Sequence, residues 1–326
     1  MTGSLRRSSF DDLAACLRGE WPAGADWTDV AREANRYLVA PALYAALRRS
    51  GGLAAVPADL ADYLRLLYDL NCERNARLVE QALEAVAALN AAGMEPLLLK
   101  GAGVVLTAPP DRRGERMMSD LDLVVAAGRV PDAMSQLSAL GYRVLSTDVG
   151  SHAHASLFRP EDPGAIDLHQ RPPGPSGFYD EDGRPAEEPI ALGGVRARLP
   201  SPTERAIHLI VHDMMHDGLL RRGRLELRHL LDLRDLVAQG VDWKAIGQRL
   251  STRPGAWALQ LSVLNLRELL HVEIPDAGHV DRFTRVLYRR QMLKIRRPWF
   301  RRLDEALFPF LYPGWSRLRA VARRRR

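Results

Sequence analysis

The stretch that decides the fold is Met94-Glu-Pro-Leu-Leu-Leu-Lys100-Gly101, followed by Arg116-Met-Met-Ser-Asp120-Leu-Asp122-Leu-Val-Val125. The first segment is an apolar run that ends at a Lys-Gly pair. The second is an apolar run that carries two carboxylates two residues apart. Short apolar runs bounded by Gly and Pro are typical of buried strands. We therefore predict a strand, a turn that faces phosphate, and a second strand that binds a metal ion.

The residues after this stretch predict a small mixed α/β sheet. Apolar runs alternate with helical spacing, and a Pro-rich break joins the last two runs as a β-hairpin. The expected strands are 96–99, 120–125, 142–146, 154–159 and 165–170, with a helix at 130–140. Residues 171–200 are rich in Pro and Gly and predict a long loop with a minor hairpin around Gly193-Gly194.

Both flanks of the sheet show the three- and four-residue spacing of apolar side chains that indicates helices. Before the sheet, helices are expected at 11–17, 27–48 and 57–90, and Gly93 is placed to cap the last one. After it, Ser201, Pro202 and Glu204 form the start signal of a helix that runs to about residue 217. Further helices are expected at 225–238, 256–270 and 281–297.

The expected architecture is therefore α+β, a small mixed β-sheet core flanked by N-terminal and C-terminal α-helical domains. We place the N-terminal helical cap at 1–94, the α/β core at 95–200 and the C-terminal helical domain at 201–326. A chain of 326 residues is long enough for two or three such domains. No run approaches the roughly 18 apolar residues of a membrane span, so a cytoplasmic protein is expected.

Positive charge is concentrated at the end of the chain. The whole chain has a net charge of +6, but residues 281–326 alone carry +12 and the remainder carries −6. Arginines alternate there with Trp299, Phe300, Phe308, Phe310, Tyr312 and Trp315. The basic tail 282–326 could bind RNA or another acidic partner by phosphate contacts and stacking, or lie on an anionic membrane surface. The alternative is a tail whose aromatic side chains pack on the helical domain.

Three carboxylates predict a metal site. Asp120 and Asp122 lie two residues apart on a strand, so both side chains leave the same face. Asp167, in Ala165-Ile-Asp-Leu-His169, is centred in the hairpin strand and is the natural third carboxylate. Oxygen ligands beside a phosphate-binding turn suit Mg²⁺, with Mn²⁺ as the alternative ion.

The order of strand, Lys-Gly, helix, Arg-x-x-x-Asp-Leu-Asp-Leu-Val, helix and hairpin resembles an uncharacterised bacterial nucleotidyltransferase family of the DNA polymerase β-like superfamily. The resemblance covers roughly residues 75–235. It implies that Asp120, Asp122 and Asp167 bind metal and are catalytic. It also implies that Lys100, Gly101 and Ser119 bind the phosphates of a nucleotide, and that Arg116 either binds phosphate or braces the turn. The turn is usually Gly-Ser in the superfamily and is Lys-Gly here.

Several histidines are candidates for the cleft. His208, His212 and His216 recur every four residues and form one stripe of a helix. His212 and His216 are expected to pack near Asp232, and they could face the cleft as a proton acceptor or a phosphate ligand. A zinc site needs such clustering, but no Cys or His-Glu-x-x-His arrangement accompanies it. His169 shares the strand face of Asp167 and has either a site role or a structural one.

The resemblance implies a Mg²⁺-dependent nucleotidyltransferase that moves a nucleoside monophosphate from an NTP such as ATP to an acceptor and releases pyrophosphate. The acceptor stays open between RNA, a protein or peptide, and a small molecule. The alternative is a non-catalytic nucleotide-binding or scaffold protein that retains the fold. No P-loop, dinucleotide fingerprint or serine-hydrolase elbow is present.

Overall fold

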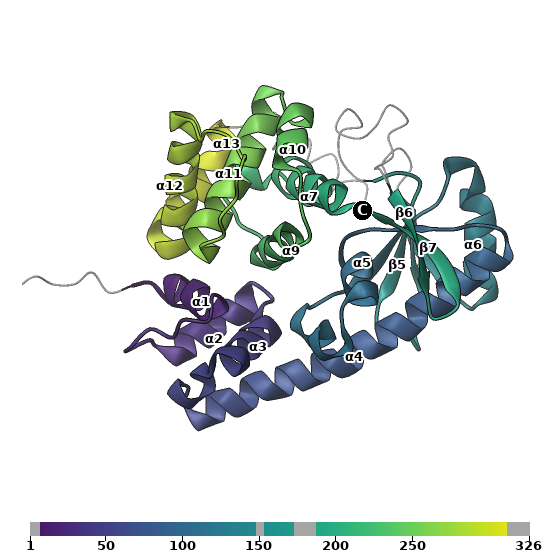
Figure 1. The fold of residues 1–326 in the computed structure, drawn as a ribbon, viewed down its shortest axis with the longest axis horizontal. Helices are drawn as coiled ribbons and strands as arrows, with labels where there is room; N and C mark the ends of the chain where they lie inside the picture. The colour runs from purple at the N-terminus through teal and green to yellow at the C-terminus, as the bar shows by residue number, and fades with distance from the viewer. Residues whose placement is uncertain (1–6, 148–152, 173–186, 312–326) are drawn as a thin grey trace, which may run out of the picture.

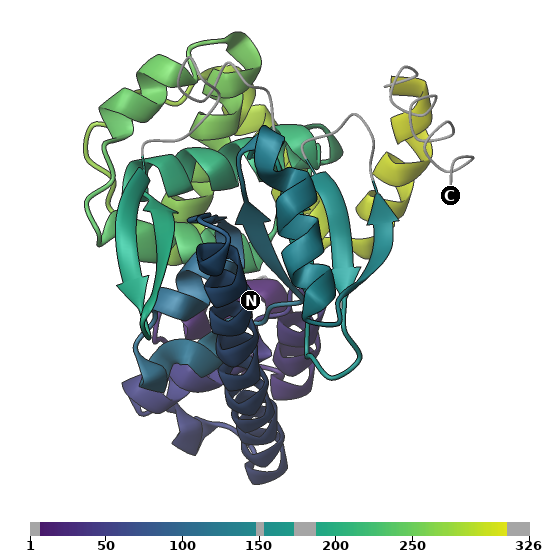
Figure 2. The same ribbon diagram turned by 90° about the vertical axis from the view of Figure 1, so that its right-hand side faces the viewer.

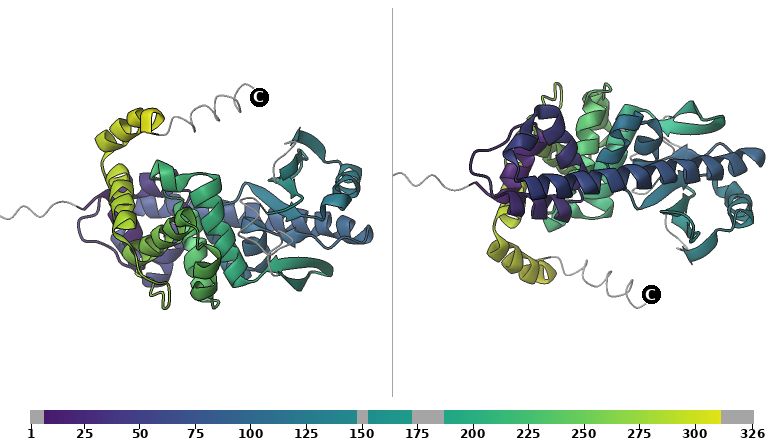
Figure 3. Two further views of the ribbon diagram at one scale, coloured as in Figure 1. Left: turned by 90° about the horizontal axis from the view of Figure 1, so that it is seen from above. Right: turned by 90° about the horizontal axis from the view of Figure 1, so that it is seen from below.

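The structure is a computed structural model that describes residues 7–147, 153–172 and 187–311. Figure 1 shows a β-sheet at one end of the molecule and two groups of helices at the other. The long helix α4 (Ala58–Ala91) runs beneath the molecule and joins the N-terminal helices to the sheet, as the view from below in Figure 3 also shows. The chain is an α+β protein, as the sequence predicts.

The sheet has seven strands in the order β3-β4-β5-β2-β1-β7-β6. The strands are β1 (Leu97–Leu98), β2 (Asp120–Val124), β3 (Arg143–Thr147), β4 (Ala153–Phe158), β5 (Ala165–His169), β6 (Glu187–Leu192) and β7 (Val195–Pro200). Parallel pairing joins β2 to β5 and β1 to β7, and the other neighbours are antiparallel. The predicted hairpin between β4 and β5 is confirmed.

The hairpin around Gly193-Gly194 is larger than the sequence predicts. Its strands β6 and β7 form the second edge of the main sheet, because β7 pairs with β1 through Leu97 and Arg198. The prediction of a loop over 171–200 is therefore wrong for the part from Glu187 onward, while 173–186 lies outside the described residues. Both glycines have positive φ (53° and 87°), which suits a two-residue hairpin turn.

One face of the sheet is covered by helices. Figure 2 shows α4 running lengthwise beside the strands, and α5 (Lys100–Thr107) and α6 (Val130–Ala139) complete the layer. Leu121 and Leu123 of β2 point into this layer and are almost fully buried. Because alternate residues of a strand face opposite sides, Asp120, Asp122 and Val124 lie on the other face. Helices thus bury one side of β2 and leave its carboxylates on the other.

The N-terminal helices are α1 (Ser9–Leu17), α2 (Trp27–Arg36) and α3 (Ala40–Ser50), followed by a 3₁₀ turn η1 (Gly52–Ala55). The prediction of one helix over 27–48 is wrong. The chain breaks at Leu38, whose φ of 56° lies in the left-handed region and cannot continue a right-handed helix. Gly93 follows α4 with a φ of 72°, as expected for a residue that terminates a helix.

The C-terminal helices begin where the start signal predicts. The Glu204 N–H donates to the Ser201 hydroxyl at 3.3 Å, and Pro202 is the first helical residue. The helices are α7 (Pro202–Val211), a π-helical turn η5 (His212–His216), α8 (Leu219–Arg222), α9 (Leu227–Val237), α10 (Trp243–Arg249), α11 (Arg253–Leu270), α12 (Arg282–Arg296) and α13 (Pro298–Leu311). The sequence predicts α7, α9, α11 and α12 and misses α8, α10 and α13.

The two groups of helices share one hydrophobic core. Phe10 and Leu43 of the N-terminal group belong to the same buried cluster as Leu209, Leu230 and Leu266 of the C-terminal group. The domain boundaries at residues 94 and 200 stay a prediction. The hydrophobic cores do not coincide with these domains, because one core contains helices from both ends of the chain. Among the described residues, none of the helices combines the length and apolar character needed to cross a membrane.

The aromatic tail is described only in part. Trp299 on α13 is 64% exposed, so the predicted packing of the tail aromatics on the helical domain is wrong for this residue. The reason is that α13 faces α12 through Asp304, which is bound by Arg290 and Lys294, and Trp299 lies off that contact. Residues 312–326, and the side chains of Phe308 and Phe310, lie outside the described residues.

Candidate active site

Strands β2 and β5 bring the predicted carboxylates together. The two strands run parallel, and Asp122 stands directly opposite Asp167. Asp120 lies two residues before Asp122, and His169 lies two residues after Asp167, so all four side chains share one face. Ile166 and Leu168 point to the buried face, as Leu121 and Leu123 do. The alternation of polar and apolar residues in both strands therefore builds the group.

Asp122 is the most enclosed of these groups, with 2% of the residue exposed. Its Oδ1 accepts a hydrogen bond from Lys100 Nζ at 3.0 Å and one from His169 Nε2 at 2.9 Å. Burial alone would raise the pKa of Asp122, but Lys100 and His169 outweigh it and hold the pKa well below its usual range. Burial opposes the charge of Lys100 as well, yet Asp122 raises the pKa of Lys100. The two form a charged pair.

Asp120 is in the opposite situation. It is half-buried, and burial, followed by the charges of Asp122 and Asp167, raises its pKa, while Lys100 and Ser119 oppose the shift only in part. Like charges close together disfavour ionisation unless a cation balances them. Three carboxylates facing one ammonium leave such an imbalance at this site.

The donor atoms present fit a divalent cation. One ligand atom from each of Asp122, Asp167 and His169 lies within 4.8 Å of the others. Both hydrogen bonds to Asp122 use Oδ1, so Oδ2 stays available to an ion. Two carboxylates with a third beside them suit Mg²⁺, and the imidazole suits Mn²⁺ as well. His169 also belongs to this group, although the sequence predicts only that it shares a strand face with Asp167.

The Lys100-Gly101 turn opens helix α5 beside the carboxylates. Lys100 has a φ of 43°, an uncommon conformation for a residue with a Cβ, and its ion pair with Asp122 holds it there. Gly101 allows a close approach of Arg116, because a Cβ at this position would lie 2.5 Å from Arg116 Nη1 and would displace that side chain. The first N–H groups of a helix attract anions, so this turn can hold a phosphate. Ser119 is exposed at the start of β2.

Arg116 forms an ion pair with Asp232 of helix α9. Its Nε lies 2.9 Å from both carboxylate oxygens, and its Nη2 lies 2.8 Å from Oδ2. Both side chains are largely buried. Arg116 therefore braces Gly101 on one side and a C-terminal helix on the other, and the sequence does not predict this partner.

The histidine stripe leads to a second group of polar side chains. His212 Nδ1 lies 3.1 Å from Asp213 Oδ1, and His229 Nδ1 lies 2.8 Å from the same oxygen. Burial opposes the charged form of His229, but Asp213 raises the pKa of His229 overall. The structure thus pairs His212 with Asp213 and His229, whereas Asp232 pairs with Arg116. Asp213 lies between His212 and His216 in the sequence. His229 comes from α9, a separate segment, so the local spacing of residues does not predict its contact with Asp213.

Two larger cavities lie near the site. One, of about 210 Å³, is lined by Leu97 of β1, Val124 of β2, Arg171 and Arg198, among other residues. The other, of about 460 Å³, lies behind Arg116. It is lined from all three parts of the chain, for example by Val39, Thr107, Arg205, Arg228 and Asp232.

Two solved structures are similar to part of this chain. The antibiotic-resistance factor ANT(2'')-Ia is 14% identical with a TM-score of 0.39, and the match covers 60% of this chain and 98% of that one. An antigenic nucleotidyltransferase-like protein from Paracoccidioides brasiliensis is 20% identical with a TM-score of 0.36, over 59% of this chain and 92% of that one.

A search of curated proteins gives no match. The family described as uncharacterised nucleotidyltransferase matches residues 23–271, which is most of the chain and includes every candidate residue of the sheet. The family confirms the resemblance on which the sequence analysis rests. The chain therefore belongs to this family of nucleotidyltransferases and is an enzyme of that class.

Proposed function

We propose that the protein transfers a nucleoside monophosphate from an NTP to an acceptor hydroxyl or phosphate. An oxygen of the acceptor attacks the α-phosphorus, the bond from that phosphorus to the β-phosphate oxygen breaks, and pyrophosphate leaves. The observation that carries the proposal is the pairing of Asp122 with Asp167 in register on neighbouring strands, with Lys100 bound to Asp122.

The residues of the turn would bind the triphosphate. Lys100 presents a charged ammonium at the first turn of α5, and the N–H groups after it point toward the same space. Arg116 lies over Gly101 and, held by its ion pair with Asp232, supports the turn from behind. Ser119 supplies a hydroxyl beside Asp120. These four residues favour the leaving pyrophosphate because its negative charge develops next to them.

Asp120, Asp122 and Asp167 would hold Mg²⁺, or Mn²⁺ in its place. When bound, the ion balances the carboxylates and polarises the phosphate oxygens. Asp122 is fixed by Lys100 and His169, so it orients the group. The Asp167 side chain is half-buried and faces the open side of β5, which suits its carboxylate to take the proton of the acceptor hydroxyl.

The acceptor class stays open between RNA, a protein or peptide, and a small molecule. The basic segment 282–326 favours an acidic macromolecule, because its arginines supply phosphate contacts. The cavity of about 210 Å³ favours a small acceptor or side chain, because it is lined by Val124 of β2 and by the cationic side chains of Arg171 and Arg198.

The test is to incubate the protein with each α-labelled NTP, Mg²⁺ and a cell lysate. We expect label to enter one of the three acceptor classes with one NTP and pyrophosphate to be released in equal amount. Asp167→Asn is expected to lower the transfer by at least about a hundredfold, as loss of a general base does. Absence of label with every NTP, or undiminished labelling by the variant, would contradict the proposal.

A further inference from the structure

The turn after α7 has a geometry that brings two histidines and an aspartate together. His212–His216 forms a π-helical turn, and the Asp217 N–H donates to the His212 carbonyl at 2.8 Å, an i to i+5 bond. Such single π turns inside helices are rare and occur frequently at functional sites. The wider turn places residues i and i+4 nearly one above the other. The imidazole rings of His212 and His216 are 5.4 Å apart.

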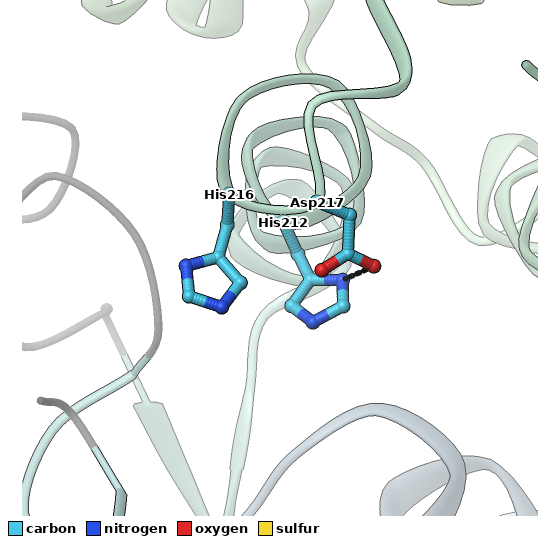
Figure 4. A group of neighbouring side chains, drawn as sticks. All are labelled: His212, His216 and Asp217. Atoms are coloured by element: carbon cyan, nitrogen blue, oxygen red, sulfur yellow. Dashed lines mark ion pairs between the residues drawn. The ribbon is translucent and has the colours of Figure 1, made fainter. Parts of the chain in front are cut away.

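Figure 4 shows both imidazoles extending from the same side of the turn, with the Asp217 carboxylate against His212. One ligand atom of each residue lies within 4.8 Å of the other two. Asp217 Oδ2 lies 3.7 Å from His212 Nδ1, the nitrogen that Asp213 also contacts, so an ion bound at Nε2 requires the Asp217 carboxylate to turn away from Nδ1. Tetrahedral zinc with bonds of about 2.1 Å separates its ligand atoms by roughly 3.4 Å. Small side-chain rotations would therefore complete the geometry.

The neighbouring residues support this arrangement. Asp213 is buried and contacts His212 through Nδ1, and it is held in turn by His229 at 2.8 Å. A carboxylate on one nitrogen of an imidazole fixes the ring and leaves the other nitrogen to a metal ion. Asp213 and His229 are enclosed, whereas His216 and Asp217 are exposed. An ion can therefore reach the turn from solvent.

The ligand types decide which ion fits. Two imidazoles and one carboxylate suit Zn²⁺ and related transition metals, whereas Mg²⁺ prefers oxygen ligands throughout. We propose that His212, His216 and Asp217 bind one Zn²⁺ ion. Three protein ligands leave a fourth position for water or for an anionic oxygen. This site is separate from the Asp122 group.

The experiment uses the full chain, stripped of metal with a chelator and titrated with Zn²⁺ against a chromophoric zinc indicator. We expect one tight Zn²⁺ per chain. His216→Ala and Asp217→Asn should each weaken binding by at least about tenfold, the range seen when even the outer contacts of a metal ligand are lost. Both residues are exposed, so the fold is expected to survive, and circular dichroism checks it.

Two control variants separate this site from others. His279→Ala removes an exposed histidine elsewhere and should leave Zn²⁺ affinity unchanged. Asp122→Asn disrupts the group of Asp122, Asp167 and His169 and should also leave it unchanged. Co²⁺ in place of Zn²⁺ should give the visible absorption of a four-coordinate site in the wild type and lose it in His216→Ala. Zn²⁺ binding that is absent, insensitive to both ligand variants, or lost in Asp122→Asn would overturn the proposal.

Discussion

Asp120 and Asp122 have the same side chain and lie on the same strand face, but the pKa of Asp120 is raised and that of Asp122 is lowered. Asp122 is ionised and held by Lys100 and His169, whereas Asp120 is crowded by Asp122 and Asp167. One carboxylate therefore stabilises the fold, and the other is kept at some cost in stability. Residues held for activity against stability are common at catalytic sites.

We predict that Asp122→Asn and Asp120→Asn both abolish nucleotidyl transfer but affect stability differently. Asp122→Asn leaves the buried ammonium of Lys100 without its charged partner and should lower the free energy of unfolding by about 3 kcal/mol. Asp120→Asn removes a repelled charge and should leave that free energy unchanged or raise it by up to about 1 kcal/mol. Urea unfolding of the three proteins measures the difference. A large loss of stability in Asp120→Asn would contradict this account.

We predict that Lys100→Met weakens the binding of NTP and destabilises the fold by about 3 kcal/mol. The ammonium is lost, the Asp122 carboxylate keeps only His169, and the left-handed backbone at residue 100 loses the contact that holds it. The matched control is Lys244→Met, on the exposed surface of α10, which should change stability by less than about 0.5 kcal/mol. Calorimetric titration with a non-hydrolysable NTP gives the affinity. Equal affinities for the two variants would show that Lys100 does not contact phosphate.

Helices and strands that have local sequence signals could be predicted. Those whose position depends on contacts with distant parts of the chain could not. The helix that starts at Ser201 and the β4–β5 hairpin follow from capping residues and from turn residues. The place of β7 beside β1 depends on a pairing between Leu97 and Arg198, about 100 residues apart, and no local pattern carries that information. The break at Leu38 is also unmarked, since leucine rarely adopts a positive φ.

The same division applies to the candidate site. Asp120, Asp122 and Asp167 could be predicted because strand alternation fixes their face, and their topological order suggested that they meet. The partner of Arg116 could not be predicted, since Asp232 lies on a helix that approaches only in the folded chain. The π-helical turn also has no sequence signal, so the spacing of His212 and His216 suggested an ordinary helical stripe.

Helix α13 is attached to α12 mainly by one buried carboxylate. Asp304 accepts from Arg290 at 2.6 Å and from Lys294 at 2.5 Å. Burial opposes its charged form, but Arg290 and Lys294 lower the pKa of Asp304 below its ordinary value. A depressed pKa means that the contribution to stability is complete above the unfolded pKa of about 4 and is lost as the pH falls through the folded value.

We therefore predict that α13 loosens at acid pH before the rest of the molecule. Hydrogen exchange of peptides from 298–307, corrected for the intrinsic effect of pH on the rate, should keep its protection above about pH 4 and lose it as the pH falls further. Asp304→Asn should show the weakened protection already at neutral pH. Equal protection of α13 in Asp304→Asn and the wild type at neutral pH would contradict the role of this carboxylate.

At the scale of the whole molecule, the Arg116–Asp232 pair joins the sheet region to the C-terminal helices. We predict that Arg116→Met lowers the free energy of unfolding by about 3 to 5 kcal/mol, because it leaves Asp232 buried and unpaired. Asp232→Leu should be costly as well, and the double variant should lose less than the sum of the two. A coupling energy of about 1 to 3 kcal/mol in the double-mutant cycle measures the pair.

The cycle also separates the two roles considered for Arg116. If Arg116 acts only as a structural brace, the double variant should recover much of the transfer activity of the wild type. If it also contacts phosphate, activity should stay low after stability is restored. Additive losses of stability would show that the ion pair contributes nothing measurable.

Helix α4 connects the two hydrophobic cores of the molecule. It has 34 residues, which corresponds to a rod of about 51 Å, and contains neither Gly nor Pro. Its first half places Leu64 in the core shared by the two groups of helices, and its second half places Leu78 and Leu89 in the core of the sheet. Unfolding of α4 in one core would therefore disturb the packing of the other core, because both contain side chains of the same helix.

The consequence concerns cooperativity. A chain of this size with two hydrophobic cores would ordinarily melt in separate steps. Because one uninterrupted rod supplies side chains to both cores, we expect calorimetry of the wild type to show one unfolding transition. A glycine pair in place of Asn71 and Cys72, at the middle of α4, should divide it into two. In that variant the two hydrophobic cores would unfold at different temperatures, whereas in the wild type the intact helix makes them unfold together.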